Sequence, residues 1–191
     1  MIRFPLLIIL LFGRFALLFA QSSLPAFASK EFRSLEVKAG KNGLLQMPVI
    51  PNVNVLYQRN IGPHLAAVFY SEAAFSAFTP NPEEEYLVRK YFRWVGTAGL
   101  GGTTGKKGIG NSLFLLAGGR YYHSHAYVQE DLMPELVTSR LMPELGLLYD
   151  LKIGKKQTYF SFQHYIPLHP FRMLLAGEGF RTTSLGIGVR L

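Results

Sequence analysis

Residues 184–191, SLGIGVRL, alternate with a period of two, and this alternation decides the fold. The apolar residues of the stretch share one face of an extended strand: Leu185, Ile187, Val189 and Leu191. Small or polar residues share the opposite face. The apolar face must meet either a protein core or lipid, and the rest of the chain indicates which.

Similar alternation recurs after residue 30, whereas helical periodicity is scarce. The pattern predicts eight strands, over residues 34–40, 52–60, 64–72, 90–100, 111–123, 140–153, 157–166 and 182–191. The third and seventh of these are ambiguous, because the contrast between their two faces is weak. The chain is therefore predicted to be all-β.

The connections between the predicted strands alternate between short and long. Short turns lie near residues 61–63, 102–111 and 154–156, and long connections cover 41–51, 73–89, 124–139 and 167–181. Outer-membrane barrels have an even number of antiparallel strands, short periplasmic turns and long external loops. We therefore predict an eight-stranded antiparallel up-and-down transmembrane β-barrel with all four long loops outside the cell.

Composition narrows the function classes. The chain has 191 residues, enough for one domain, and it has no cysteine, which excludes disulfides and thiolate metal sites. Charged residues make up 17% of the chain, below the roughly 25% of soluble domains. The net charge of +8 is scattered along the sequence, so we expect no nucleic-acid partner.

The first twenty residues, MIRFPLLIILLFGRFALLFA, resemble an export signal, with a basic residue, an apolar run and small residues. Cleavage after Ala20 gives a signal peptide over 1–20 and a barrel domain over 30–191. Cleavage after Ala28 is the alternative, because Ala26-Phe27-Ala28 fits the A-x-A rule. An uncleaved anchor is less favoured, because proline, glycine and arginine interrupt the run.

If the apolar faces meet lipid, a set of charged side chains points into the barrel: Glu36, Lys38, Arg93, Arg120, Glu144, Asp150, Lys152 and Arg190. An eight-stranded barrel is only wide enough for side chains to fill. Because unpaired buried charge is costly, we predict that these residues form an interior network of ion pairs. A gated channel or a binding cavity is the alternative interpretation of the same charges.

The alternation of apolar and polar residues does not by itself show which face of each strand contacts water. A soluble periplasmic barrel would bury Leu145 and Leu147 and expose Asp150 and Lys152. The export signal, the unequal loops and the apolar last residue favour the membrane protein.

The stretch RYYHSHAY (120–127) is the strongest candidate for catalysis, since a lipid hydrolase could use His123 or His125 with Ser124. Neighbouring strand residues point to opposite faces, however, so His123 and Ser124 do not pair simply. An aromatic belt at the lipid headgroups is the favoured interpretation, formed by Tyr121, Tyr122, His123 and Tyr127. No metal-ligand spacing or nucleotide motif is present, so we expect no catalytic residues, metal or cofactor.

The last strand, TSLGIGVRL (183–191), resembles the closing strand of bacterial outer-membrane barrels at Leu185, Ile187, Val189 and Leu191, although a terminal Phe is commoner there than Leu. The resemblance implies that these four residues are read by the barrel-assembly machinery. Residues 30–191 resemble a small eight-stranded outer-membrane protein of the Bacteroidota type. RSLEVKAG (33–40) is faintly similar to the opening strand of TraO-type conjugal-transfer proteins.

This resemblance implies a location in the outer membrane of a Gram-negative bacterium. The implied partners are outer-membrane lipid, lipopolysaccharide, the barrel-assembly machinery and an envelope protein complex. We expect a non-enzymatic integral protein whose surface loops serve envelope stability, adhesion or partner binding. The alternatives are a barrel component of a conjugation or secretion apparatus and a lipid A-modifying hydrolase.

Overall fold

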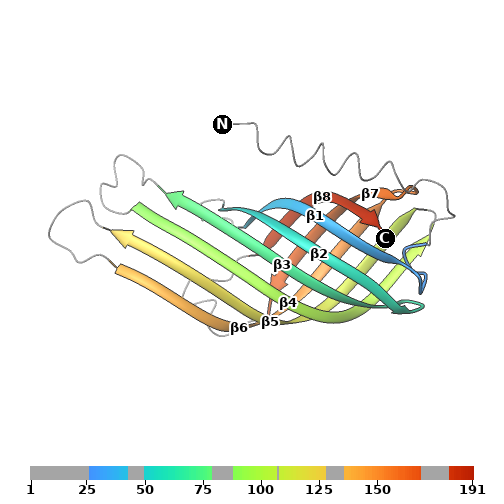
Figure 1. Ribbon diagram of the computed structural model, residues 1–191, viewed down its shortest axis with the longest axis horizontal. Coiled ribbons are helices and arrows are strands. Elements are labelled where there is room, and N and C mark those ends of the chain that lie inside the picture. Colours follow the sequence, from blue (N-terminus) through green and yellow to red (C-terminus); the bar gives the residue numbers. More distant parts are fainter. Residues whose placement is uncertain (1–25, 43–49, 79–87, 107, 128–135, 169–180) are drawn as a thin grey trace.

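The computed structural model describes residues 26–42, 50–78, 88–106, 108–127, 136–168 and 181–191. They form one closed antiparallel barrel of eight strands, in which β8 returns to pair with β1 (Figure 1). The strands are β1 Arg33–Asn42, β2 Ile50–Gly62, β3 Leu65–Phe78, β4 Val88–Lys106, β5 Ile109–Tyr127, β6 Leu136–Ile153, β7 Thr158–Pro167 and β8 Thr182–Arg190. The predicted all-β barrel is confirmed. None of the residues in these ranges forms a helix long and apolar enough to cross a membrane.

The barrel has two distinct ends. The turns β2–β3, β4–β5 and β6–β7 lie at one end, which we call the turn end (Figure 1). Arg33 and Leu191 also lie there, since Leu191 N donates to Arg33 O over 3.0 Å. The four longer connections leave from the other end, which we call the loop end.

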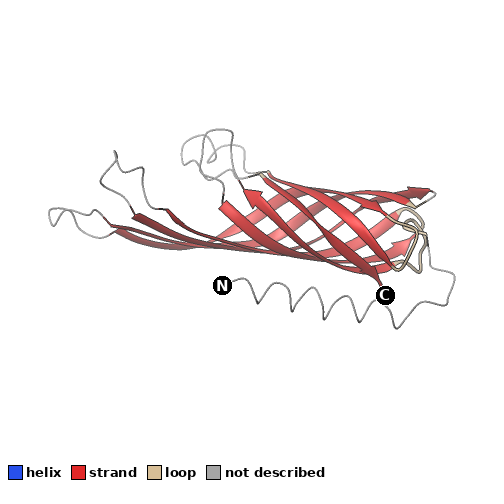
Figure 2. Cartoon of the chain, turned by 90° about the horizontal axis from the view of Figure 1, so that it is seen from above, coloured by secondary structure: helices blue, strands red, loops and turns tan. Residues whose placement is uncertain are grey.

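Several strands are longer than predicted. β4 and β5 have 19 residues each and β6 has 18, and these strands project beyond the barrel at the loop end (Figures 1 and 2). Parts of the predicted loops 73–89 and 124–139 are therefore strand, and only residues 107–108 separate β4 from β5. Strand pairing satisfies backbone groups whether or not the outer face is apolar, so the alternation marks only part of each strand.

Pro143 lies inside β6 at a place that tolerates it. The pairing of β6 with β7 begins at Gly146, opposite Pro167, whereas β6 itself begins at Leu136. Pro143 therefore lies where β6 has a strand neighbour on one side only, as prolines in sheets usually do.

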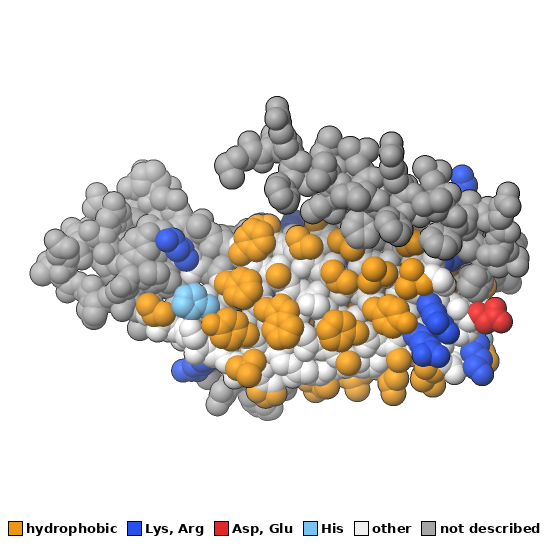
Figure 3. All heavy atoms as spheres, viewed as in Figure 1, with side chains coloured by type: hydrophobic (Ala, Val, Ile, Leu, Met, Phe, Trp, Pro, Cys, Tyr) orange, Lys and Arg blue, Asp and Glu red, His pale blue; other side chains and the backbone are white. Residues whose placement is uncertain are grey.

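The outer wall of the barrel is apolar and the interior is polar. Leu113 and Leu115 are 54% and 53% exposed, whereas Asp150 and Lys152 are 0% and 1% exposed. Hydrophobic side chains cover the visible wall between the two ends (Figure 3). An apolar surface of this extent marks contact with lipid or another protein. These faces are the reverse of those that a soluble barrel would need.

An apolar layer crosses the middle of the lumen. Its buried members come from five neighbouring strands: Leu56, Val68, Val95, Phe114, Leu116 and Leu148. This layer explains why the strand over 64–72 has no clear polar face. Val68 points inward and Phe69 outward, yet both are apolar.

Candidate functional site

The charge group nearer the turn end is a ring of four side chains. Glu36 and Lys38 come from β1, and Asp150 and Lys152 come from β6. Lys38 contacts Glu36 and its Nζ lies 3.5 Å from Asp150 Oδ1, while Lys152 contacts Asp150 and its Nζ lies 3.1 Å from Glu36 Oε1. Lys38 Nζ also donates to Gln163 Oε1 over 2.7 Å. Two carboxylates and two ammonium groups thus neutralise one another out of water.

Strand β7 supplies hydroxyl groups to this ring. Ser161 Oγ lies 2.9 Å from Glu36 Oε2 and 2.6 Å from Asp150 Oδ1, and its single proton serves one carboxylate at a time. Tyr159 OH donates to Glu36 Oε1 over 2.8 Å. Such bonds occupy carboxylate lone pairs that would otherwise remain unsatisfied in a dry interior.

Glycines on β8 make room for the ring. Gly186 pairs with Lys38 and Gly188 with Glu36 in the β1–β8 register. A Cβ on Gly186 would lie 2.7 Å from Lys38 Cγ, and one on Gly188 would meet the ring of Tyr159. Because these side chains are absent, Glu36 and Lys38 of β1 can contact Lys152 and Asp150 of β6, past β8 and β7.

The second charge group lies nearer the loop end and contains a residue that the sequence did not single out. Glu72 on β3 is 1% exposed and forms an ion pair with Arg93 on β4. Tyr70 OH donates to the same carboxylate, and Arg93 Nη2 donates to Thr182 Oγ1 over 3.5 Å. Glu72 lies on the strand whose two faces were hardest to distinguish.

Arg120 and Glu144 complete the second group. Arg120 Nε lies 3.3 Å from Glu144 Oε2, and Tyr165 OH donates to Glu144 Oε1 over 2.6 Å. The ring of Tyr165 stacks on Tyr70 with the centroids 5.4 Å apart. It also occupies the space beside Gly146, where a Cβ would meet the ring. The two ion pairs are thereby joined through a pair of stacked tyrosines.

Seven of the eight charged residues predicted to point inward take part in these ion pairs. Arg190 is the exception. It is 5% exposed, its Nη2 donates to Gly154 O over 2.9 Å, and its guanidinium lies 4.3 Å from the centroid of the Phe27 ring. Its partners are thus the carbonyls of Gly154 and Lys155 and the rings of Phe27 and Tyr159 at the turn end.

The predicted aromatic belt is wrong for Tyr122. Tyr122 is 9% exposed and points inward, so it does not belong to the belt, because the strand pleat sends Tyr121 and His123 to the outer face. His123 Nδ1 lies 2.7 Å from Ser139 Oγ on β6. The side chains of Ser124, His125 and Tyr127 are not among those described.

His123 and Ser139 form a cross-strand pair on neighbouring strands β5 and β6. They are directly opposite each other in the β5–β6 register, so their contact is an ordinary cross-strand pair. Among the described residues, no carboxylate bonds to His123 to complete a triad, and no group of three His, Asp or Glu could hold a metal.

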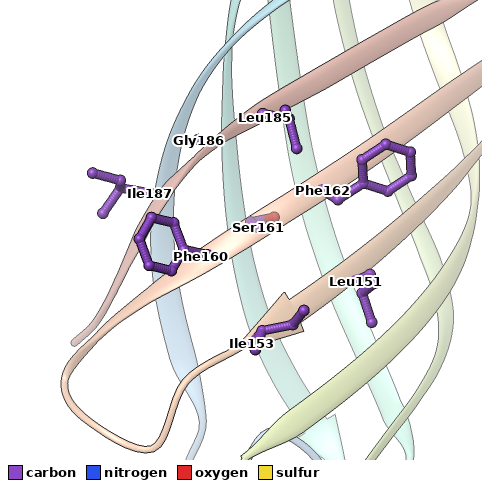
Figure 4. A pocket seen from close by; sticks show the side chains of 8 residues that line it. All are labelled: Leu151, Ile153, Phe160, Ser161, Phe162, Leu185, Gly186 and Ile187. Atoms are coloured by element: carbon purple, nitrogen blue, oxygen red, sulfur yellow. The ribbon is translucent and has the colours of Figure 1, made fainter.

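An apolar groove of about 420 Å³ lies on the outer wall over β6, β7 and β8 (Figure 4). Its side chains are Leu151, Ile153, Phe160, Phe162, Leu185 and Ile187. Ser161 also borders the groove, but its hydroxyl is bonded inside the barrel. The groove offers dispersion contacts and no polar chemistry, which suits an acyl chain rather than a polar substrate.

No protein-family model matches this chain, and no curated protein matches it. Solved structures share its fold. Ail, the attachment invasion locus protein of Yersinia pestis, has a TM-score of 0.55 at 12% identity, covering 84% of this chain and 97% of Ail. Neisserial surface protein A has a TM-score of 0.51 at 10% identity, covering 84% of this chain and 95% of that one. The chain thus has the fold of eight-stranded outer-membrane barrels.

Proposed function

We propose that this chain is an integral outer-membrane protein of a Gram-negative bacterium, with no catalytic activity of its own. The observation that carries the proposal is the distribution of side chains, with charges paired inside the barrel and large apolar residues outside. In water this arrangement would expose the apolar wall without compensation. In a bilayer it satisfies both faces, because the closed strands leave no unpaired edge in lipid.

The filled lumen supports a structural role rather than transport. Leu56, Phe114, Leu116 and Leu148 are all fully buried and belong to one apolar cluster inside the barrel. The ion pairs of Lys38 with Asp150 and of Lys152 with Glu36 tie β1 to β6, which are not neighbours in the wall. The barrel is therefore a rigid support that holds the external loops at the cell surface for envelope stability, adhesion or partner binding.

Fractionation with a gel assay tests the location. The membrane fraction is run on a denaturing gel with and without boiling, since closed membrane barrels stay compact in detergent until heated. We expect a membrane-bound band whose mobility changes on boiling. Recovery of the protein in the soluble periplasm would overturn the proposal.

Epitope tags test the orientation. A tag inserted within residues 79–87, between β3 and β4, is expected to bind antibody on intact cells. The same tag within the β6–β7 turn at 154–156 is expected to bind only after the outer membrane is broken. The reverse pattern would contradict external loops.

A polyanionic surface ligand is a second candidate. Ail has been solved in complex with the heparin analogue sucrose octasulfate. In this chain Arg140 is exposed on the projecting part of β6, beside Tyr122 of β5 in register. The test measures how well cells are retained on immobilised heparin. Retention that falls with Arg140→Gln but does not change with Lys156→Gln, at the turn end, would support this ligand class.

An assembly role rests on the faint similarity of residues 33–40 to TraO-type conjugal-transfer proteins. Cross-linking in a strain that carries a conjugative element tests it. Recovery of envelope proteins other than the barrel-assembly machinery would support a place in a conjugation or secretion apparatus, and recovery of that machinery alone would count against it.

A further inference from the structure

Phe27 closes the turn end of the barrel from inside. It precedes β1, and its side chain is 2% exposed. The rings of Phe32 and Tyr159 pack edge-on against it, with centroids 5.4 and 5.1 Å away. The Arg190 guanidinium lies 4.3 Å from its centroid. Phe27 is thus the centre of an aromatic cluster beneath the charged ring of Glu36 and its partners.

The backbone around Phe27 is held by a buried amide. Asn60 is 2% exposed, and its Nδ2 donates to Phe27 O over 2.9 Å and to Ser29 O over 2.7 Å. Its Oδ1 accepts a bond from Gln58 Nε2 over 2.8 Å, and its backbone N donates to Phe32 O over 3.0 Å. Both side-chain donors of Asn60 are therefore committed to residues 27–29, and removal of Phe27 would cost one of these bonds in a buried place.

The barrel wall lacks side chains where the Phe27 ring lies. Gly105 on β4 and Gly110 on β5 pair with each other in register. A Cβ on Gly110 would lie 2.7 Å from Phe27 Cγ, and a Cβ on Gly105 would lie 2.9 Å from Phe27 Cβ. Each distance is shorter than side chains tolerate, so this pair of glycines forms a recess that Phe27 fills.

We infer that residues 26–32 are a permanent plug of the mature barrel, and that the export signal is therefore cleaved upstream of Phe27. Of the two bonds that the sequence offers, this leaves the one between Ala20 and Gln21. Cleavage after Ala28 would remove the ring, vacate the recess at Gly110 and release an Asn60 donor. The inference about the cleaved bond rests on the proposed export to the outer membrane, whereas the plug rests on these contacts alone.

Intact-mass spectrometry of the protein purified from the outer-membrane fraction tests the cleaved bond. We expect a chain that begins at Gln21. A chain that begins at Ser29 would overturn the inference and leave the proposed function intact. A chain that keeps residues 1–20 would overturn both the assigned bond and the cleaved signal on which it rests.

Gly110→Ala tests the plug independently. If Phe27 is present, the new methyl group collides with its ring, and the temperature at which the compact band disappears on the gel falls by several degrees. In a Phe27→Gly background, which removes all three atoms of Phe27 that the methyl group would meet, the same substitution is expected to cause no further fall. Gly119→Ala on the same strand is the matched control, because the nearest atom to its Cβ is 3.8 Å away.

Two results decide whether the plug exists in the mature protein. Gly110→Ala with the stability of the unmodified protein would overturn it, because the recess would then be empty. If Gly110→Ala does not accumulate in the membrane, restored accumulation of the Phe27→Gly/Gly110→Ala double variant supports the plug. Failure of the double variant as well would count against it.

Discussion

Lys38 Nζ on β1 lies 3.5 Å from Asp150 Oδ1 on β6, although β7 and β8 separate these two strands in the wall. The contact crosses the lumen. The two side chains can meet because Gly186 and Gly188 of β8, which lie between β1 and β7, have no side chains to occupy this space. The ring therefore joins non-neighbouring strands, and its members are expected to stabilise the closed barrel rather than a single hairpin.

Asp150→Asn is expected to lower the free energy of unfolding by about 3–5 kcal/mol, because it leaves an excess positive charge buried among Lys38 and Lys152. Urea unfolding in lipid vesicles, followed by tryptophan fluorescence, measures this change. Glu31→Gln is the control, since Glu31 is exposed and its loss is expected to change stability by less than about 0.5 kcal/mol.

A compensating variant separates charge imbalance from lost packing. Asp150→Asn combined with Lys152→Met removes one charge of each sign, and most of the lost stability is expected to return. If the double variant is no more stable than Asp150→Asn, the ring does not act through charge balance.

Gly146→Ala is expected to lower stability by about 1–3 kcal/mol through overpacking, because its Cβ would meet the ring of Tyr165. Displacement of that ring would also break the 2.6 Å bond from Tyr165 OH to Glu144. Gly102→Ala serves as the control, since the nearest atom to its Cβ, His64 O, lies 3.9 Å away. Equal unfolding midpoints for the two variants would contradict the packing of Tyr165 against Gly146.

The sequence allowed the faces of most strands to be predicted, because a strand that borders lipid on one side must alternate. Leu113 and Leu115 point outward and Arg120 inward, as the alternation requires. The alternation is weakest where the lumen itself is apolar. Val68 and Tyr70 point inward and Phe69 outward, so β3 lacked contrast and Glu72 was overlooked.

Partners across the lumen could not be predicted from alternation. It gives the face of Lys38 and of Asp150, but their contact depends on how all eight strands close. The role of Phe27 could not be predicted for a different reason, because Ala26-Phe27-Ala28 also fits the pattern of a signal-cleavage site. The inward glycines Gly105 and Gly110 were the available sign that a bulky group fills the turn end.

Leu115→Arg is expected to destabilise the barrel in vesicles by about 2–4 kcal/mol, if Leu115 lies near the middle of the bilayer. Leu115 is 53% exposed and faces Leu100 and Leu147 in register. Val137→Arg is expected to cost only about 0–1 kcal/mol, because Val137 lies on the part of β6 that projects beyond the barrel. Equal costs at the two positions would mean that the lipid band covers the projection as well.

Leu191→Ser is expected to slow assembly without changing stability. Leu191 is 64% exposed, and its backbone N–H, which donates to Arg33 O, survives the substitution. If the assembly machinery reads the Leu191 side chain, less protein reaches the outer membrane. The purified, refolded variant is expected to unfold at the same urea concentration as the original chain. Leu113→Ser is the control, since Leu113 is similarly exposed but lies outside the last strand. Normal membrane levels of Leu191→Ser would show that its side chain is not part of the assembly signal.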